Sequence, residues 1–316
     1  MNRVDQYIQA ATRANTRRSY KAALEHFEVT WGGLLPATAE SVARYLADHA
    51  GSHAVSTLRQ RLAAIAQWHL SQGFPDPTKA PMVRQVLRGI RTLHPAPPRQ
   101  AVPLPLMQLQ QVSDQLEAQA DHARQAADLP ALLRARRDQA LLLLGFWKGL
   151  RSDELGRLQV EHIQIEPGVA LTVFLAQSKA DRQALGQQTR IPALKVLCPV
   201  KAYTAWIEAA GIARGPVFRK LDRWGNLGDA GLHPSSFIPL IRAAFTRAGL
   251  ENSALTSHSL RRGFATWAMG NGWDLKSLMN YVGWKDIKSA MRYIDPADSF
   301  GGLALAGTAK MPPALG

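Results

Sequence analysis

Two segments of the sequence place an arginine beside a second group that could help it hold a phosphate. In GFWKGLRSDELGRL, Glu154 follows Arg151 by three residues, so on a helix its carboxylate could hold the guanidinium in one orientation. In TSHSLRRGFATWAMGNGW, His258 and Arg261 would share one face of the first helical turn. A guanidinium can grip two phosphate oxygens and an imidazole can move a proton, so this pair suits a phosphodiester. Each pair alone is also compatible with an ordinary structural contact.

A third segment, LMNYVGWKDIKSAMRYIDP, contributes two aromatic side chains. Gly283 is expected to end one helix, Trp284 follows it, and Asp286 can cap a short helix that carries Tyr293. Taken singly, Trp284 and Tyr293 would be core aromatics in most proteins.

The chain as a whole is basic. Its 316 residues include 38 Lys and Arg against 24 Asp and Glu, a net charge of +14, which favours nucleic acid as a partner and an anionic membrane surface second. The single cysteine, Cys198, excludes an intramolecular disulfide framework and a cysteine-rich metal site. No apolar run approaches the ~18 residues of a membrane span and the first residues lack a signal-peptide pattern, so we expect a cytoplasmic protein.

The elements that must position these residues lie on both sides of a proline-rich segment. PAPPRQAVPLP (95–105) holds five prolines, which cannot build a helix and predict a linker. Residues 1–94 read as helices, one of them capped by Thr38. Beyond the linker, further helices flank a β signal at HIQIEPGVALTVFLAQSKA and TRIPA. The predicted fold class is therefore mainly α with a small antiparallel β-sheet.

The segment before the linker is the more densely basic part of the chain, and several of its arginines fall on two predicted helices. With few acidic residues nearby, contact with the DNA backbone is a better interpretation than scattered solvated charge. The candidate DNA-binding residues are Arg59, Arg61, Arg84, Arg88 and Arg91.

The three chemical segments together resemble the tyrosine recombinase (phage integrase) family, in its Cre- and Xer-like branch. The order is an arginine, then His-x-x-Arg, then Gly-Trp, then a tyrosine nine residues later, all after a basic helical segment and a proline-rich linker. The resemblance covers nearly the whole chain and implies a C-shaped clamp on DNA. Its implied parts are a helical core-type DNA-binding domain (1–94), a linker (95–105), a mixed α/β catalytic domain (106–298) and a C-terminal tail (299–316).

The resemblance also implies a role for each matching residue. Arg151 and Arg261 correspond to the family's two catalytic arginines, His258 to the histidine of His-x-x-Arg, and Tyr293 to the nucleophile. Glu154 would support Arg151.

Two further positions are matched less closely. Trp284 stands where most members have a second histidine, although the Cre-like branch also has tryptophan there. Its indole N–H can donate to a phosphate oxygen but cannot transfer a proton, which shifts the acid–base work onto Lys179 and His258. Lys179, in AQSKADRQ, resembles the family's hairpin lysine, but the loop after it is longer than the expected tight turn, and a solvated charge or a phosphate contact remains the alternative.

The implied activity is site-specific cleavage and rejoining of DNA strands through a covalent 3′-phosphotyrosine, without metal or ATP. The sequence agrees, since it has no Walker A loop, no HExxH motif and no visible cluster of metal ligands. The resemblance implies that the chain binds a double-stranded recombination site and acts as a homotetramer on two such sites. Accessory proteins could also take part, and no membrane partner is expected. The tail at 299–316 is expected to dock on a neighbouring protomer.

Two alternatives share this chemistry or this fold. One is a type IB topoisomerase-like enzyme that relaxes DNA, and the other is a catalytically inactive DNA-binding regulator. For a recombinase, the sequence is compatible with integration or transposon resolution in a mobile genetic element, and with plasmid or chromosome dimer resolution.

Overall fold

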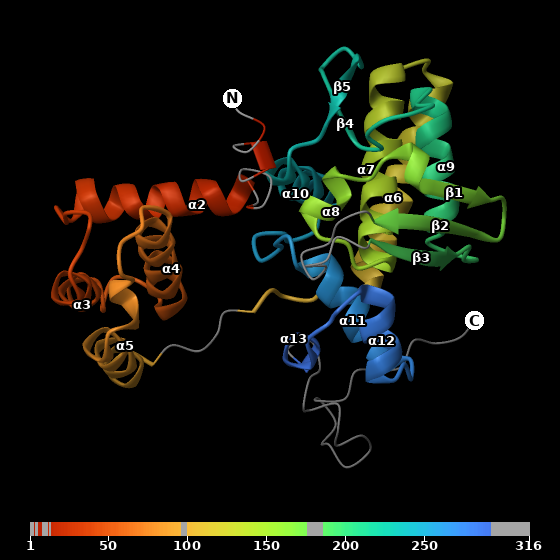
Figure 1. The fold of residues 1–316 in the computed structure, drawn as a ribbon. Coiled ribbons are helices and arrows are strands. Elements are labelled where there is room, and N and C mark those ends of the chain that lie inside the picture. The colour runs from red at the N-terminus through yellow and green to blue at the C-terminus, as the bar shows by residue number, and fades with distance from the viewer. Residues whose placement is uncertain are drawn as a thin grey trace. The chain divides into compact units, whose positions relative to one another are not determined.

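The computed structural model describes residues 14–95, 100–175 and 186–291, with residues 3, 6, 7 and 12, and the chain divides into two compact units, Met1–Arg99 and Gln100–Gly316 (Figure 1). The predicted fold class is confirmed, because helices dominate both units and the strands of the second form small antiparallel sheets. Among the helices within these ranges, none combines the length and the apolar character needed to cross a membrane.

The first unit is a set of helices around one apolar core. Thr38 caps a helix as its position predicted, since its Oγ1 accepts a hydrogen bond from the Ser41 amide at 3.1 Å. Phe27, Tyr45 and Ile65 are among the fully buried side chains of this core. Its helices are α2 (Ala14–Glu25), which continues into a π-helical turn (His26–Thr30), α3 (Ala39–Asp48), α4 (Val55–Ser71), a 3₁₀ turn (Pro77–Lys79) and α5 (Pro81–Leu93).

The second unit is organised around one buried helix. Helix α7 (Leu129–Trp147) carries a long apolar run that is buried on every face. Four helices pack against it: α6 (Leu106–Gln125), α9 (Pro199–Ala210), α10 (Phe237–Arg247) and α11 (Ser259–Gly270). Leu104, within the predicted linker, also belongs to this core, and its amide donates to Ser259 O at 3.1 Å. The remaining helices are α8 (Ser152–Gly156), α12 (Leu275–Val282) and α13 (Ile287–Met291), with 3₁₀ turns at Val160–His162 and Pro234–Ser236.

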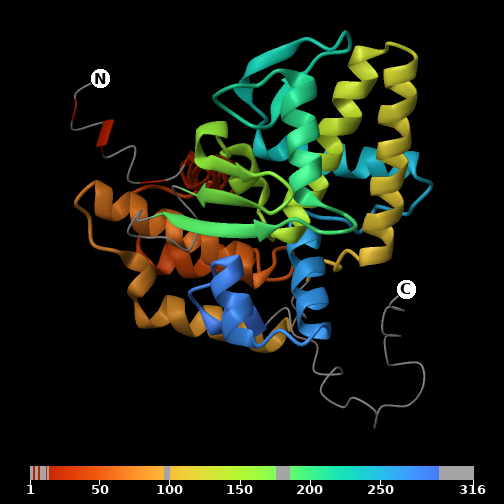
Figure 2. The ribbon, with the colours of Figure 1, turned by 90° about the vertical axis from the view of Figure 1, so that its right-hand side faces the viewer.

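Two antiparallel sheets complete the second unit. The β signal of the sequence forms β1 (Ile163–Glu166), β2 (Ala170–Leu175) and β3 (Gln187–Pro192), paired in that order, with Val173 opposite both Ile163 and Thr189. This sheet lies beside α9 (Figure 2), and its buried residues alternate with exposed ones along β3. A second hairpin, β4 (Arg219–Leu221) with β5 (Leu227–Gly231), has no counterpart among the predicted elements.

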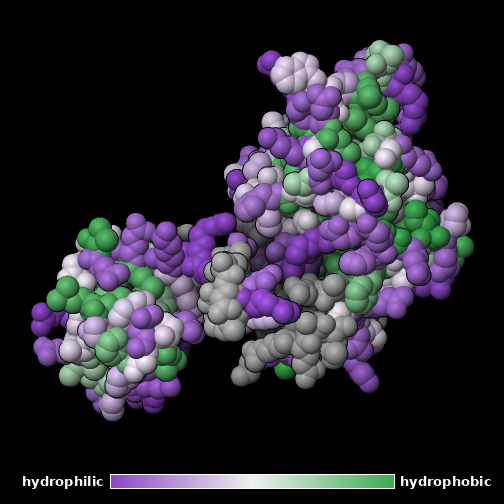
Figure 3. Space-filling model, turned by 45° about the horizontal axis from the view of Figure 1, so that its top comes forward, coloured by the Kyte–Doolittle hydropathy of each residue, from purple (hydrophilic) through white to green (hydrophobic). Residues whose placement is uncertain are grey.

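Hydrophilic side chains predominate on the face of the molecule shown in Figure 3, with scattered hydrophobic patches between them. Such single patches are ordinary for a folded protein.

Candidate active site

Arg151 stands between the end of α7 and the short helix α8, and Glu154 holds it there. The Arg151 Nη1 atom donates to Glu154 Oε1 at 2.7 Å, and the Arg151 backbone amide donates to Glu154 Oε2 at 2.9 Å. The glutamate side chain is 4% exposed and the arginine side chain 21%. The contact expected from the three-residue spacing is present, and it leaves the guanidinium partly accessible in a fixed orientation.

Arg261, from the first turn of α11, also approaches this glutamate. Its side chain is 1% exposed, and its Nη1 lies 3.5 Å from Glu154 Oε2 and donates to Gly149 O at 2.8 Å. Burial raises the pKa of Glu154, but the charges of Arg261 and Arg151 outweigh burial and bring that pKa below its ordinary value. We call Arg151, Glu154 and Arg261 the two-arginine cluster: a buried carboxylate that stays ionised and holds two guanidinium groups together.

Trp284 packs onto this cluster. It is buried, and the Arg261 guanidinium lies 5.1 Å from the centroid of its ring, within cation–π range. Gly283 ends α12 as the sequence predicted, in the left-handed conformation with φ +79°. This turn directs the chain from α12 to the position of Trp284 over Arg261.

His258 is the N-cap residue of α11 and is exposed. Its backbone amide donates to Thr256 Oγ1 at 3.3 Å, which anchors the loop just before the helix. His258 and Arg261 therefore share the first turn of one helix, with the imidazole at the surface and the guanidinium in the interior.

Two residues matched to the family's catalytic set lie outside the described residues. Lys179 falls in the segment between the end of β2 at Leu175 and the start of β3 at Gln187, and Tyr293 comes two positions after the end of α13 at Met291. The tail at 299–316 also lies outside them.

Sequence reasoning missed Lys148, which lies directly before the Gly-Leu-Arg of the cluster. It is 1% exposed, and its Nζ donates to Tyr281 O and lies 5.1 Å from the centroid of the Tyr281 ring. Burial lowers the pKa of Lys148 to about 7, with a further lowering by the charge of Arg261 and an opposing effect of Glu154. The available signal was a lysine at the end of the apolar run ALLLLGFWK, where water is excluded.

The candidate DNA-binding arginines of the first unit fall into two groups. Arg61 is half-buried, and its Nη1 lies 2.9 Å from both the Tyr45 hydroxyl and His26 Nδ1, so its guanidinium is engaged within the unit. The other four are exposed on α4 and α5 and are available to a polyanion, namely Arg59, Arg84, Arg88 and Arg91.

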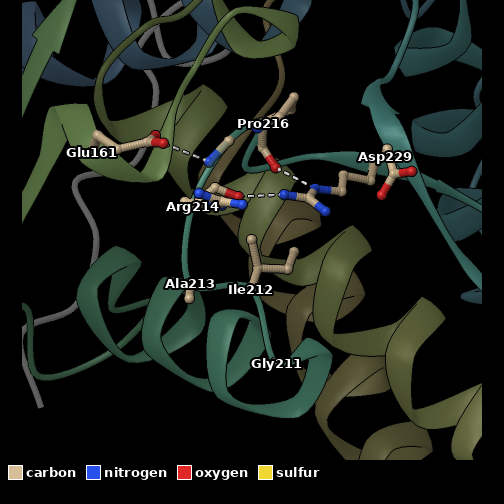
Figure 4. Close-up of a pocket in the computed structure, with 9 residues that line it drawn as sticks. Glu161, Gly211, Ile212, Ala213, Arg214, Pro216 and Asp229 are labelled. Carbon is tan, nitrogen blue, oxygen red and sulfur yellow. Dashed lines mark hydrogen bonds between the residues drawn. The ribbon is translucent and has the colours of Figure 1, made fainter.

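A surface pocket of about 410 Å³ elsewhere in the second unit is lined in part by charged residues (Figure 4), namely Glu161, Arg214, Arg219 and Asp229. Arg219, one of its two arginines, donates to the carbonyls of Pro216 and Arg214, and Glu161 accepts from the Gly215 amide at 2.8 Å. These groups hold the local loop together, and none of the lining residues belongs to the two-arginine cluster. Within the described ranges, no set of three or more His, Cys, Asp or Glu side chains is placed to hold a metal ion.

Comparison with known proteins gives consistent matches. The profile described as Phage integrase family matches residues 114–299. An integrase/recombinase xerD homolog from Selenomonas ruminantium is 31% identical over 271 residues, which cover 84% of this chain and 76% of the relative. Recombinase cre from Escherichia phage P1 is 24% identical over 278 residues, covering 84% of this chain and 78% of the relative.

Among solved structures, the Tn1549 transposon integrase in complex with transposon right end DNA matches with a TM-score of 0.59. The alignment covers 90% of each chain at 13% identity, and it shows a shared fold.

Proposed function

The chain belongs to the phage integrase family of tyrosine recombinases, and we propose that it cuts and rejoins DNA at specific sites through a covalent 3′-phosphotyrosine on Tyr293. The observation that supports this site most strongly is the two-arginine cluster, in which Glu154 is shared by Arg151 and Arg261. Two preorganised guanidinium groups suit the extra charge on the equatorial oxygens of a pentacoordinate phosphorus.

The reaction assigns a separate task to each remaining residue. The phenol oxygen of Tyr293 attacks phosphorus while His258 takes its proton, and the bond from phosphorus to the 5′ oxygen breaks as Lys179 protonates that oxygen. Trp284 donates its indole N–H to a phosphate oxygen. The phosphotyrosine preserves the energy of the broken bond, so a 5′-hydroxyl of a second strand can displace Tyr293 without ATP or a metal ion.

The partner of this reaction is a double-stranded recombination site. We propose that residues 1–94 form a core-type DNA-binding domain, 95–105 the linker and 106–298 the catalytic domain, and that the two domains close on DNA as a C-shaped clamp. Four protomers on two sites would supply the four active sites of strand exchange, with residues 299–316 docking on a neighbour. The enzyme acts in the cytoplasm, where its DNA lies. The solved Tn1549 integrase, which shares the fold, is bound to DNA.

Replacement of exposed arginines on α5 should weaken DNA binding and make the binding constant less dependent on salt concentration. Arg84→Gln with Arg88→Gln removes two cations, so the slope of log K against log salt should become shallower by about 0.9 for each lost phosphate contact. Arg44→Gln is the matched control, because Arg44 is exposed but pairs with Glu40 at 3.3 Å. Fluorescence titration of a labelled duplex at several salt concentrations measures the slope, and an unchanged slope in the double variant would remove these arginines from the interface.

Covalent trapping tests the proposed function. The duplex for this test is selected by binding to the protein from a pool of random sequences. It is then nicked so that the fragment released by cleavage diffuses away. The protein should accumulate on this duplex as a covalent adduct that survives denaturation. Adduct formation on a scrambled duplex at the same rate would indicate a topoisomerase-like enzyme instead. Binding without any adduct would indicate a DNA-binding regulator.

A further inference from the structure

Building on the proposed function, we propose that Lys148 is a positioning residue of the recombination reaction. Its buried Nζ holds the C-terminal end of α12 against the two-arginine cluster. It thereby places the segment that carries Trp284 and leads along the chain toward Tyr293.

The last carbonyls of α12 are satisfied from outside the helix, by side chains of three other elements. Gln187, on β3, donates to Asn280 O at 3.0 Å; Lys148, at the end of α7, donates to Tyr281 O; and Arg261, on α11, donates to Val282 O at 3.4 Å. These carbonyls have no partner within their own helix and carry the negative end of its dipole. We call this set of three bonds the α12 cap, and Lys148 supplies its central bond.

The chain leaves α12 through a tight turn next to this cap. The amides of Gly283 and Trp284 both donate to Met279 O, at 2.9 and 2.8 Å. Trp284 then lies over the Arg261 guanidinium, and α13 follows. Movement of Tyr281 away from Lys148 would therefore displace Trp284 from the cluster together with the segment that follows it.

The charge of Lys148 adds a second effect. The charged and titratable groups that face it are Arg261 on α11, Glu154 on α8 and the phenol of Tyr281 on α12. With a pKa of about 7, Lys148 is an ammonium in mild acid and an amine in mild base. The ammonium makes the stronger, charge-assisted bond to Tyr281 O and adds positive potential beside Arg261. The α12 cap is therefore tighter below pH 7 than above it.

The charged form of Lys148 opposes folding. Its pKa in the folded chain lies below the value of about 10.4 for an exposed lysine, so the unfolded chain binds more protons between about pH 7 and 10. The contribution of its ionisation to stability is therefore least favourable below pH 7 and improves as pH rises through that window. A buried cation that opposes folding beside an active site indicates a role in the reaction.

The first test measures adduct formation by Lys148→Met, which keeps the volume and removes the charge. At saturating nicked duplex and pH 6, we expect cleavage to slow about tenfold with DNA affinity within about twofold of wild type, because Lys148 is 1% exposed and a buried side chain offers no direct contact to DNA. The ratio of wild-type to variant rate should fall to about two at pH 8.5, since the wild-type ammonium is then mostly lost. Lys276→Met, at the exposed start of α12, is the control and should match wild type.

The second test does not require cleavage. Amide hydrogen exchange in the DNA-free protein should be about tenfold faster over residues 279–287 of Lys148→Met and unchanged in Lys276→Met. If Lys148→Met does not fold, the same measurements are made on Lys148→Gln, which retains a neutral hydrogen-bond donor. Its cleavage and exchange rates should lie between those expected for wild type and for Lys148→Met. Exchange at the wild-type rate in Lys148→Met would overturn the role of Lys148. A ratio of wild-type to variant cleavage rate that does not change with pH would also overturn it. Absence of any adduct from the wild type would overturn the proposed function while leaving the exchange test of the α12 cap intact.

Discussion

Arg261→Lys should reduce strand cleavage by about 10³-fold or more, even in protein that remains folded and bound to DNA. A single positioned arginine contributes about 10³–10⁵ to the rate of phosphoryl transfer. Lysine keeps the charge but has no forked guanidinium, so it cannot contact Gly149 O, Val282 O and Glu154 together as the arginine does. Single-turnover adduct formation at saturating DNA measures the loss.

The control for this substitution is an arginine that also binds backbone carbonyls but lies outside the cluster. Arg134, on α7, donates to Arg223 O at 2.6 Å and holds the β4–β5 hairpin. Arg134→Lys should lower the melting temperature modestly and leave the cleavage rate of the folded protein within about twofold of wild type. Equal rate losses in both variants would mean that Arg261 acts only through stability.

Tyr293→Phe should bind DNA with wild-type affinity and form no covalent adduct. Phenylalanine keeps the ring and removes the only atom that can bond to phosphorus, so the loss should be complete within detection. Electrophoresis of denatured samples after incubation with the nicked duplex reads out the adduct, and mobility shift of native samples reads out binding.

Other tyrosines of the second unit are poor substitutes as nucleophiles. Burial raises the pKa of both Tyr203 and Tyr281, and Tyr281 packs against Phe264 and Trp273. Tyr203→Phe is the control and should form adduct at the wild-type rate. Adduct formation by Tyr293→Phe would require a different nucleophile.

Local contacts of the site and of the first unit could be predicted from the sequence. The Arg151–Glu154 pair follows from three-residue spacing, the end of α12 from a glycine that can adopt positive φ, and the start of α3 from the capping side chain of Thr38. Each depends on residues within one turn of one another, so no knowledge of the tertiary fold is needed. The catalytic roles matched to the family remain predictions.

Contacts between distant segments could not be predicted in this way. The sharing of Glu154 by Arg261 depends on how α11 packs against α7, and the burial of Lys148 opposes the usual exposure of lysine. The β4–β5 hairpin was missed because its short strands, RKL and LGDAG, lack an apolar alternation. In the sequence Arg61 could not be distinguished from the other candidate DNA-binding arginines. Its guanidinium, however, donates a hydrogen bond to the hydroxyl of Tyr45, which lies on another helix.

Identification of the residue joined to DNA tests the central claim most directly. The trapped adduct would be digested with nuclease and trypsin, and the peptide that retains a 3′-linked nucleotide would be sequenced by mass spectrometry. Cleavage after Arg292 and Lys310 yields a peptide whose one tyrosine is Tyr293, whereas Tyr281 falls in a separate peptide that ends at Lys285. We predict the nucleotide on Tyr293. A nucleotide on Tyr281 or any other residue, or a linkage to the 5′ end of the DNA, would contradict the account.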